Sequence, residues 1–138
     1  MTQTVKVAAA HIAPIFMDKT ASAEKAAHWV TKAGDEGVQL LVFPEVFLPG
    51  FPYWINCYPP LVQADLNTRY QRESVTIDGA EIGLIVDACR QADVSIVLGI
   101  SERRVNGRTC HNSAVFITPE NGVLGVHRKL QPTYAERY

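Results

Sequence analysis

Two charged residues stand directly after predicted strands, where both could act on one small molecule. Glu45 comes just after the apolar run 39–43, at the start of a loop rich in proline and aromatic residues. Lys129 comes just after the predicted strand 123–127. A carboxylate in such a loop would be partly desolvated, and desolvation makes it a better general base. An ammonium group beside it would stay charged and would stabilise negative charge that develops in a reaction.

Each of the two residues also has an ordinary structural interpretation. A glutamate at the end of a strand commonly bonds to a neighbouring backbone group or faces water, and perturbed carboxylates also occur in structural networks. The segment around Lys129 is basic and could be a surface cluster beside an acidic partner. For either residue alone, spacing favours these interpretations, so the hypothesis of an active site requires both at one cleft edge.

The cysteines and histidines give no independent signal of a nucleophile or a metal site. No two of the three cysteines have Cys-x-x-Cys spacing, which argues against disulfides and structural zinc. Cys89 falls on the apolar stripe of a predicted helix, and Cys110 stands next to His111, so a strand would separate their side chains. Cys57 lies in the aromatic loop and is interpreted as structural. The histidines lack metal-ligand spacing, so we expect no metal.

Periodic patterns along the chain predict an α/β fold with a mixed sheet. Apolar runs predict strands at 5–10, 39–43, 94–100, 113–118 and 123–127. Apolar residues at helical spacing predict helices at 18–33 and 80–91, and we expect a further helix at 64–73. Turn residues predict an ordered loop at 46–60, a hairpin at 102–109 around Asn106-Gly107 and a turn at 119–122. Right-handed crossovers place the carboxyl ends of the parallel strands at one edge, where ligands usually bind and where Glu45 falls.

The composition limits the classes of protein to which this chain could belong. The 138 residues suit one domain, and the 47% hydrophobic and 20% charged residues are ordinary for a globular protein. A net charge of −1 gives no reason to expect nucleic acid or an anionic membrane as partner. Apolar runs fall well short of the ~20 residues of a membrane span, and no secretory signal is visible. We therefore expect a protein of the reducing cytoplasm.

Two segments together resemble the nitrilase superfamily of carbon–nitrogen hydrolases. Segment 43–50 (FPEVFLPG) is similar to the motif around the catalytic glutamate of that family. Segment 127–137 (HRKLQPTYAER) resembles the motif around its catalytic lysine. The run 51–54 (FPYW) and the PTYAER run point to the nitrile-hydrolysing branch rather than to the amidase or carbamoylase branches. With the opening strand and the strand segment 112–115 (NSAV), the resemblance spans essentially the whole chain.

The resemblance implies a role for each matching residue. In this family a cysteine thiolate attacks the nitrile carbon and forms a covalent intermediate. Glu45 then corresponds to the general base and Lys129 to the cation that stabilises developing charge. Glu136 matches the second glutamate of the family, which helps to orient the substrate and assists proton transfer. Tyr53 and Trp54 are expected to shape the substrate pocket, and no cofactor is needed.

The nucleophile of the family normally lies in a Cys-Trp-Glu segment, which this chain does not contain. We therefore expect residues 1–138 to form a single, incomplete domain, which resembles the N-terminal half of the family's α-β-β-α sandwich. The nucleophile would lie beyond the chain, so the chain alone is expected to be inactive. The alternatives are an amidase or carbamoylase, or an inactive scaffold or assembly subunit. Expected partners are a small nitrile or amide and either further copies of the chain, as a homo-oligomer, or a complementing C-terminal half.

Overall fold

The structure is a computed structural model that describes residues 4–133, and its elements follow the predicted order. The strands are β1 (Val7–Ala9), β2 (Leu40–Val42), β3 (Ser95–Arg103), β4 (Cys110–Thr118) and β5 (Gly122–Arg128). The helices are α1 (Lys19–Asp35), α2 (Ala64–Glu73) and α3 (Ala80–Ala92), with short 3₁₀ turns at Tyr53–Asn56 and Pro60–Val62. None of the described helices is both long and apolar enough to cross a membrane.

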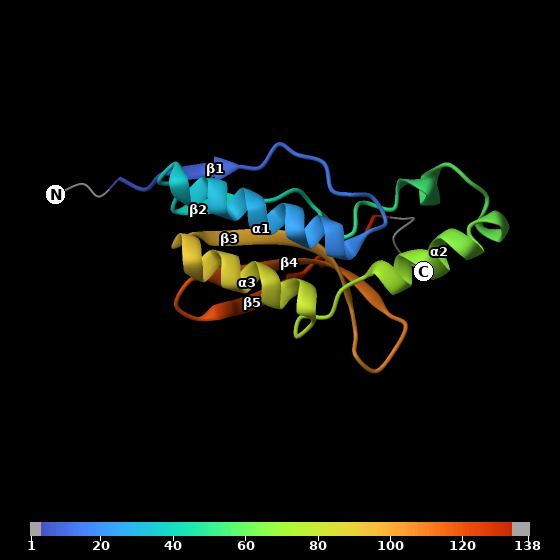
Figure 1. The fold of residues 1–138 in the computed structure, drawn as a ribbon. Helices are drawn as coiled ribbons and strands as arrows, with labels where there is room; N and C mark the ends of the chain where they lie inside the picture. Colours follow the sequence, from blue (N-terminus) through green and yellow to red (C-terminus); the bar gives the residue numbers. More distant parts are fainter. Residues whose placement is uncertain (1–3, 134–138) are drawn as a thin grey trace.

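The five strands form one mixed sheet in the order β1-β2-β3-β4-β5 (Figure 1). The first three strands run parallel, while β4 and β5 are added as antiparallel hairpins. The predicted α/β class with a mixed sheet is therefore confirmed. Because β2 and β3 run parallel while β5 runs antiparallel to β4, the ends of β2, β3 and β5 point toward the same edge of the sheet.

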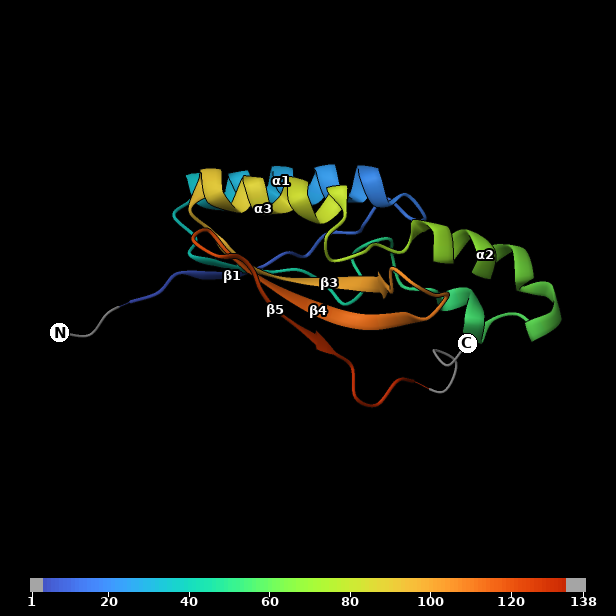
Figure 2. The ribbon, with the colours of Figure 1, turned by 90° about the horizontal axis from the view of Figure 1, so that it is seen from below.

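The helices α1 and α3 lie side by side on one face of the sheet, as Figure 2 shows. Ile96, Leu98 and Ile100 alternate along β3 and belong to the buried core beneath these helices. In the described part of the chain no helix covers the opposite face, where Val42, Val97 and Phe116 form one row across three strands. This two-layer arrangement agrees with one half of the predicted sandwich.

Several boundaries differ from the predictions, and the differences at β3 and in the aromatic loop have local causes. β3 continues through Glu102 and Arg103, which we assigned to a polar hairpin, because Glu102 finds charged and hydroxyl partners inside the sheet. The aromatic loop 46–60 contains one 3₁₀ turn at Tyr53–Asn56 and one bridge between Leu48 and Ile100, and a second 3₁₀ turn begins at its last residue. The bridge forms because Leu48, unlike the proline that follows it, has an N–H to donate.

Candidate active site

Glu45 and Lys129 meet at the edge of the sheet where β2 and β5 end. Nζ of Lys129 lies 3.0 Å from Oε1 of Glu45, although the residues are 84 positions apart in the sequence. The predicted proximity of the two charges is therefore confirmed. The prediction that Glu45 is partly desolvated is wrong: with the described residues in place, its side chain is 54% exposed. The carboxylate is held by hydrogen bonds and by the ammonium charge rather than by burial.

The loop that carries Glu45 lies directly on β3, across from Gly99. Leu48 donates its N–H to the carbonyl of Gly99 over 3.2 Å, and Ser101 donates its N–H to the carbonyl of Leu48 over 2.7 Å. A Cβ atom on Gly99 would lie only 2.3 Å from the carbonyl oxygen of Pro44 and 2.8 Å from Cα of Glu45. Only a residue without a side chain therefore permits this contact between the loop and the strand.

The residue after Glu45 has a strained backbone. Val46 has φ of 48°, a left-handed conformation that a β-branched residue rarely adopts and that costs about 1–3 kcal/mol. Its side chain is 2% exposed and packs in a small cluster with Met17, Trp54 and Tyr70. Packing of this cluster therefore offsets the strain and fixes the direction in which the chain leaves Glu45.

We expect Gly99→Ala to destabilise the protein by about 1–3 kcal/mol, because the added methyl group overlaps backbone atoms that cannot rotate away. The displacement should also separate Glu45 from Lys129. Urea unfolding measures the loss of stability, and Gly125→Ala in β5 is the matched control, since nothing lies within 4 Å of its added Cβ. Equal effects of the two substitutions would contradict this account of the loop.

Lys129 is positioned by an ion pair of the residue that precedes it. Arg128 donates from Nε and Nη2 to the two carboxylate oxygens of Glu102, over 2.9 and 2.5 Å. Ser113 donates its hydroxyl to the same carboxylate over 2.8 Å, and Glu102 itself is only 4% exposed. The hydrogen bonds from Arg128 lower the pKa of Glu102 despite its burial, and Glu102 raises the pKa of Arg128. The end of β5 is therefore anchored one residue before Lys129.

Two further contacts hold Lys129 itself. Its backbone N–H donates to the carbonyl of Asn112 over 2.8 Å, beyond the last paired residues of β5. Its Nζ also donates to the hydroxyl of Thr133 over 3.3 Å. The side-chain amide of Asn112 donates in turn to Oε1 of Glu45. Glu45, Lys129 and Asn112 thus form one connected polar group at the sheet edge.

The two aromatic residues of the loop occupy different environments. Trp54 is 3% exposed, donates its indole N–H to Asn67 over 3.0 Å and meets Tyr70 edge-on. Tyr53 is 57% exposed and stacks on Phe16 with ring centroids 5.1 Å apart. Trp54 therefore supports the loop from beneath, whereas Tyr53 lies on its surface. Glu136, the remaining predicted site residue, lies outside the described residues.

No cysteine contacts Glu45 or Lys129 in the described part of the chain. Burial in the core raises the pKa of Cys89 to about 12, so its thiol stays protonated at neutral pH. Cys57 is exposed and donates to the carbonyl of Tyr53, and Cys110 donates to the hydroxyl of Ser74. Within residues 4–133 there is also no group of three or more His, Cys, Asp or Glu residues placed to hold a metal ion.

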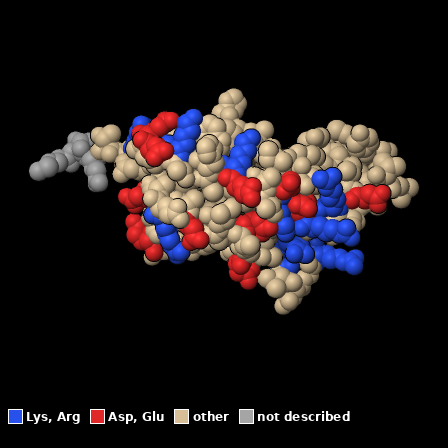
Figure 3. All heavy atoms as spheres, viewed as in Figure 1, with Lys and Arg blue, Asp and Glu red and all other residues tan. Residues whose placement is uncertain are grey.

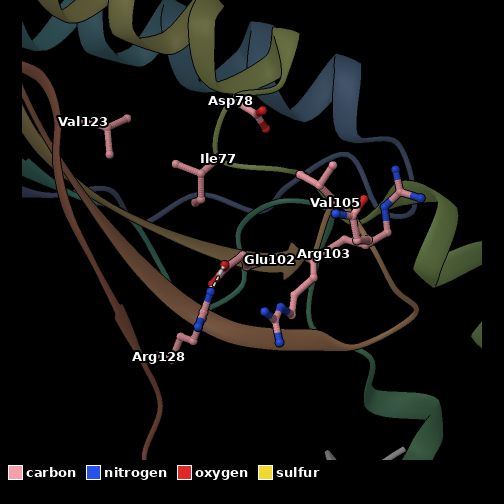
Figure 4. Close-up of a pocket in the computed structure, with 9 residues that line it drawn as sticks. Ile77, Asp78, Glu102, Arg103, Val105, Val123 and Arg128 are labelled. Carbon is pink, nitrogen blue, oxygen red and sulfur yellow. Dashed lines mark hydrogen bonds and ion pairs between the residues drawn. The ribbon is translucent and has the colours of Figure 1, made fainter.

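Several hollows lie away from the Glu45–Lys129 pair, and two of them contain charged side chains of the β3–β4 hairpin. The larger has a volume of about 440 Å³ and contains the Glu102–Arg128 ion pair, which Figure 4 shows at its wall. The second, of about 370 Å³, is lined by Arg72 of α2 with Arg103 and Arg108 of the β3–β4 hairpin. Figure 3 shows basic side chains gathered over α2 and this hairpin. In this hollow Arg103 is half-buried and Arg108 is exposed.

A family profile described as carbon–nitrogen hydrolase matches residues 6–138, nearly the whole chain. The chain belongs to the carbon–nitrogen hydrolase family. An aliphatic nitrilase of Rhodococcus rhodochrous is 35% identical over 137 residues, which cover 99% of this chain and 37% of that protein. A cyanide hydratase of Armillaria gallica is 37% identical over 139 residues, which cover 99% of this chain and 38% of that protein. The chain thus spans less than two fifths of the length of these two relatives.

Solved structures of other proteins share the fold. An amidase from Nesterenkonia sp. superposes with a TM-score of 0.65 over 96% of this chain and 45% of the amidase, at 18% identity. A glutamine-dependent NAD⁺ synthetase from Acinetobacter baumannii gives a TM-score of 0.65 over 94% of this chain and 22% of its own, at 24% identity. At these identities the likeness concerns the fold alone.

Sequence reasoning missed three residues that position the charged pair in this member of the carbon–nitrogen hydrolase family: Gly99, Glu102 and Asn112. Asn112 stands just before the predicted strand 113–118, and Glu102 stands two residues after the predicted strand 94–100, whereas both lie inside strands of the structure. A polar residue inside a strand of a buried sheet needs a partner, so longer predicted strands would have indicated that each of them finds one. Which partner it finds depends on strand register, which the sequence pattern alone did not specify.

Proposed function

We propose that this chain contributes the glutamate and the lysine of a site that hydrolyses a nitrile to a carboxylic acid and ammonia. The 3.0 Å contact between Lys129 and Glu45 carries the proposal, because it sets a proton acceptor beside a fixed positive charge. The similarity to nitrilases of 35–37% identity supports a nitrile as the substrate class.

In the proposed reaction Glu45 takes the proton of a cysteine thiol, and the thiolate attacks the nitrile carbon. The ammonium of Lys129 stabilises the negative charge that develops on nitrogen, which then takes the thiol proton back from Glu45 and gives a covalent thioimidate. Water, deprotonated by Glu45, adds to this carbon, and ammonia leaves once the nitrogen has taken up both protons of that water. A second water cleaves the thioester, which releases the acid and restores the thiol. Glu136 is proposed to orient the substrate and assist proton transfer. Tyr53 would line the substrate pocket, which Trp54 would shape by supporting the loop.

We infer that the attacking cysteine comes from a segment outside residues 1–138. This inference is supported by the positions of all three cysteines, each of which bonds or packs away from Glu45. The uncovered face of the sheet supports the need for a further segment, since Val42 and Phe116 there are each 39% exposed. A complementing C-terminal half or a second copy of the chain would bury this apolar row. Free thiols fit the reducing cytoplasm as the proposed location.

We expect residues 1–138 alone to release no ammonia from an aliphatic or aryl nitrile. The complete product of the gene, with any chain that copurifies, should release it at an enzyme-like rate. A colorimetric ammonia assay on both samples checks this expectation, and intact mass defines the chain present in each. If residues 1–138 hydrolyse nitriles by themselves, the nucleophile lies within them and Cys57, the exposed cysteine, becomes the candidate.

A second candidate function is hydration of a nitrile to an amide, which the 37% identity to a cyanide hydratase favours. Hydrolysis of an amide or carbamoyl substrate is the third. A matched nitrile and amide with the same side group, assayed for acid, amide and ammonia, separate the three reactions. Absence of all products from the complete gene product would favour an inactive scaffold or assembly subunit.

A further inference from the structure

Asn112 connects the two charged residues of the site through two different hydrogen bonds. Its side-chain Nδ2 donates to Oε1 of Glu45 over 2.5 Å, and its main-chain carbonyl accepts from the N–H of Lys129 over 2.8 Å. Asn112 is half-buried in β4, where it pairs with Ser101 of the central strand β3. One residue of the rigid sheet therefore fixes both the carboxylate of Glu45 and the backbone of Lys129.

The two oxygens of the Glu45 carboxylate have different surroundings. Oε1 accepts hydrogen bonds from Asn112 and from Nζ of Lys129. Within residues 4–133 no hydrogen bond ends on Oε2. Donors directed at Oε1 stabilise negative charge on that atom and occupy its lone pairs, so a proton adds more readily to Oε2. The 54% exposure of the side chain leaves it accessible to a reacting group.

We propose that Asn112 is a positioning residue, which reserves Oε2 of Glu45 as the atom that accepts the proton. This inference rests on the proposed function. As the S–H bond of the thiol or an O–H bond of water breaks, the proton bonds to Oε2 and the electron pair stays on the nucleophile. An amide suits this position because it donates a hydrogen bond without carrying charge and does not itself take up the proton.

The kinetic test replaces Asn112 by leucine, which has a similar shape but no donor, in the complete gene product. We expect kcat for nitrile hydrolysis to fall about 10–100-fold, as for other residues that orient a catalytic group, with KM changed less than about twofold. When Glu45→Gln is already present, Asn112→Leu should lower kcat further by less than about twofold, because no carboxylate remains to be oriented. Equal losses in both backgrounds, or a change in KM alone, would overturn the proposal.

A second variant covers the case in which leucine impairs folding. Asn112→Asp keeps the shape, removes the donor and places a second carboxylate beside Glu45, so kcat should fall at least as far as in the leucine variant. Asn106→Asp makes the same chemical change at the exposed hairpin tip, where Asp-Gly also suits the turn. We expect this control to leave kcat unchanged. Wild-type kcat in Asn112→Asp would overturn the proposal.

A spectroscopic measurement tests the contact without substrate or turnover. In residues 1–138, Glu45→Ala should shift the side-chain NH₂ signals of Asn112 in ¹H–¹⁵N spectra and leave those of Asn106 in place. Unshifted Asn112 signals would overturn the proposal. A shift in a protein whose complete gene product hydrolyses no nitrile would support the Asn112–Glu45 contact and contradict the proposed function alone, so the two failures are distinguishable.

Discussion

Glu45→Gln is expected to lower ammonia release from a nitrile by about 10²–10⁴-fold, the usual contribution of a positioned general base. Glutamine keeps the shape of the side chain and an oxygen that accepts from Lys129, but its amide does not take a proton at neutral pH. The fall should appear in kcat, because Glu45 is assigned to the proton-transfer steps rather than to substrate binding. Steady-state ammonia release by the complete gene product measures it.

Lys129→Ala should lower the rate of ammonia release by about 10²–10³-fold in the same assay. Removal of a group that stabilises transition-state charge has an effect of this size in other enzymes. The matched control for Glu45→Gln is Glu24→Gln, which makes the same change at an exposed residue of helix α1. Unchanged turnover in Glu45→Gln or in Lys129→Ala would remove the roles proposed for these residues, whatever the substrate.

Glu102→Gln is expected to lower the free energy of unfolding by about 1–3 kcal/mol at neutral pH. The carboxylate is 4% exposed and accepts three hydrogen bonds, two from Arg128 and one from Ser113, of which glutamine retains only part. Asp87→Asn is the control, because the exposed Asp87–Arg90 pair on α3 should contribute little. Urea unfolding of the three proteins gives the comparison, and equal stability of Glu102→Gln and wild type would contradict the anchoring role.

The effect of Glu102→Gln should depend on pH in one direction. The pKa of Glu102 is lowered in the folded protein, chiefly by its hydrogen bonds from Arg128. A carboxylate with a lowered folded-state pKa stabilises the fold fully above its unfolded pKa of about 4.3, and the contribution is lost as the pH falls through the folded value. The stability gap between wild type and Glu102→Gln should therefore be constant from pH 7 to about 6 and shrink in more acidic buffer. A gap that widens in acid would contradict this assignment.

The helices, the strands and the two charged residues of the site could be predicted from the sequence, because each depends on residues close together in the chain. Apolar runs predict β2 and β5, and the stripe at Ile82, Ile85 and Cys89 predicts α3, since periodicity reflects burial on one face. Glu45 and Lys129 could be identified because each follows its own strand within a recognisable local motif. The helix at 64–73 was also predicted with the bounds found.

The closeness of Glu45 to Lys129 was predicted, but strand register decided which contacts hold the two residues in place. Gly99 matters because the loop after β2 crosses it within van der Waals distance, and Glu102 matters because β5 ends with Arg128 opposite Ser113. Asn112 joins the two charges only because β4 places it beside Ser101, at the level of the loop. The Glu102–Arg128 and Glu45–Lys129 contacts link residues 26 and 84 positions apart, and a local pattern carries no information about such pairing. The sequence by itself determined which groups carry charge at strand ends, and the tertiary structure decided which of their atoms are held and by what.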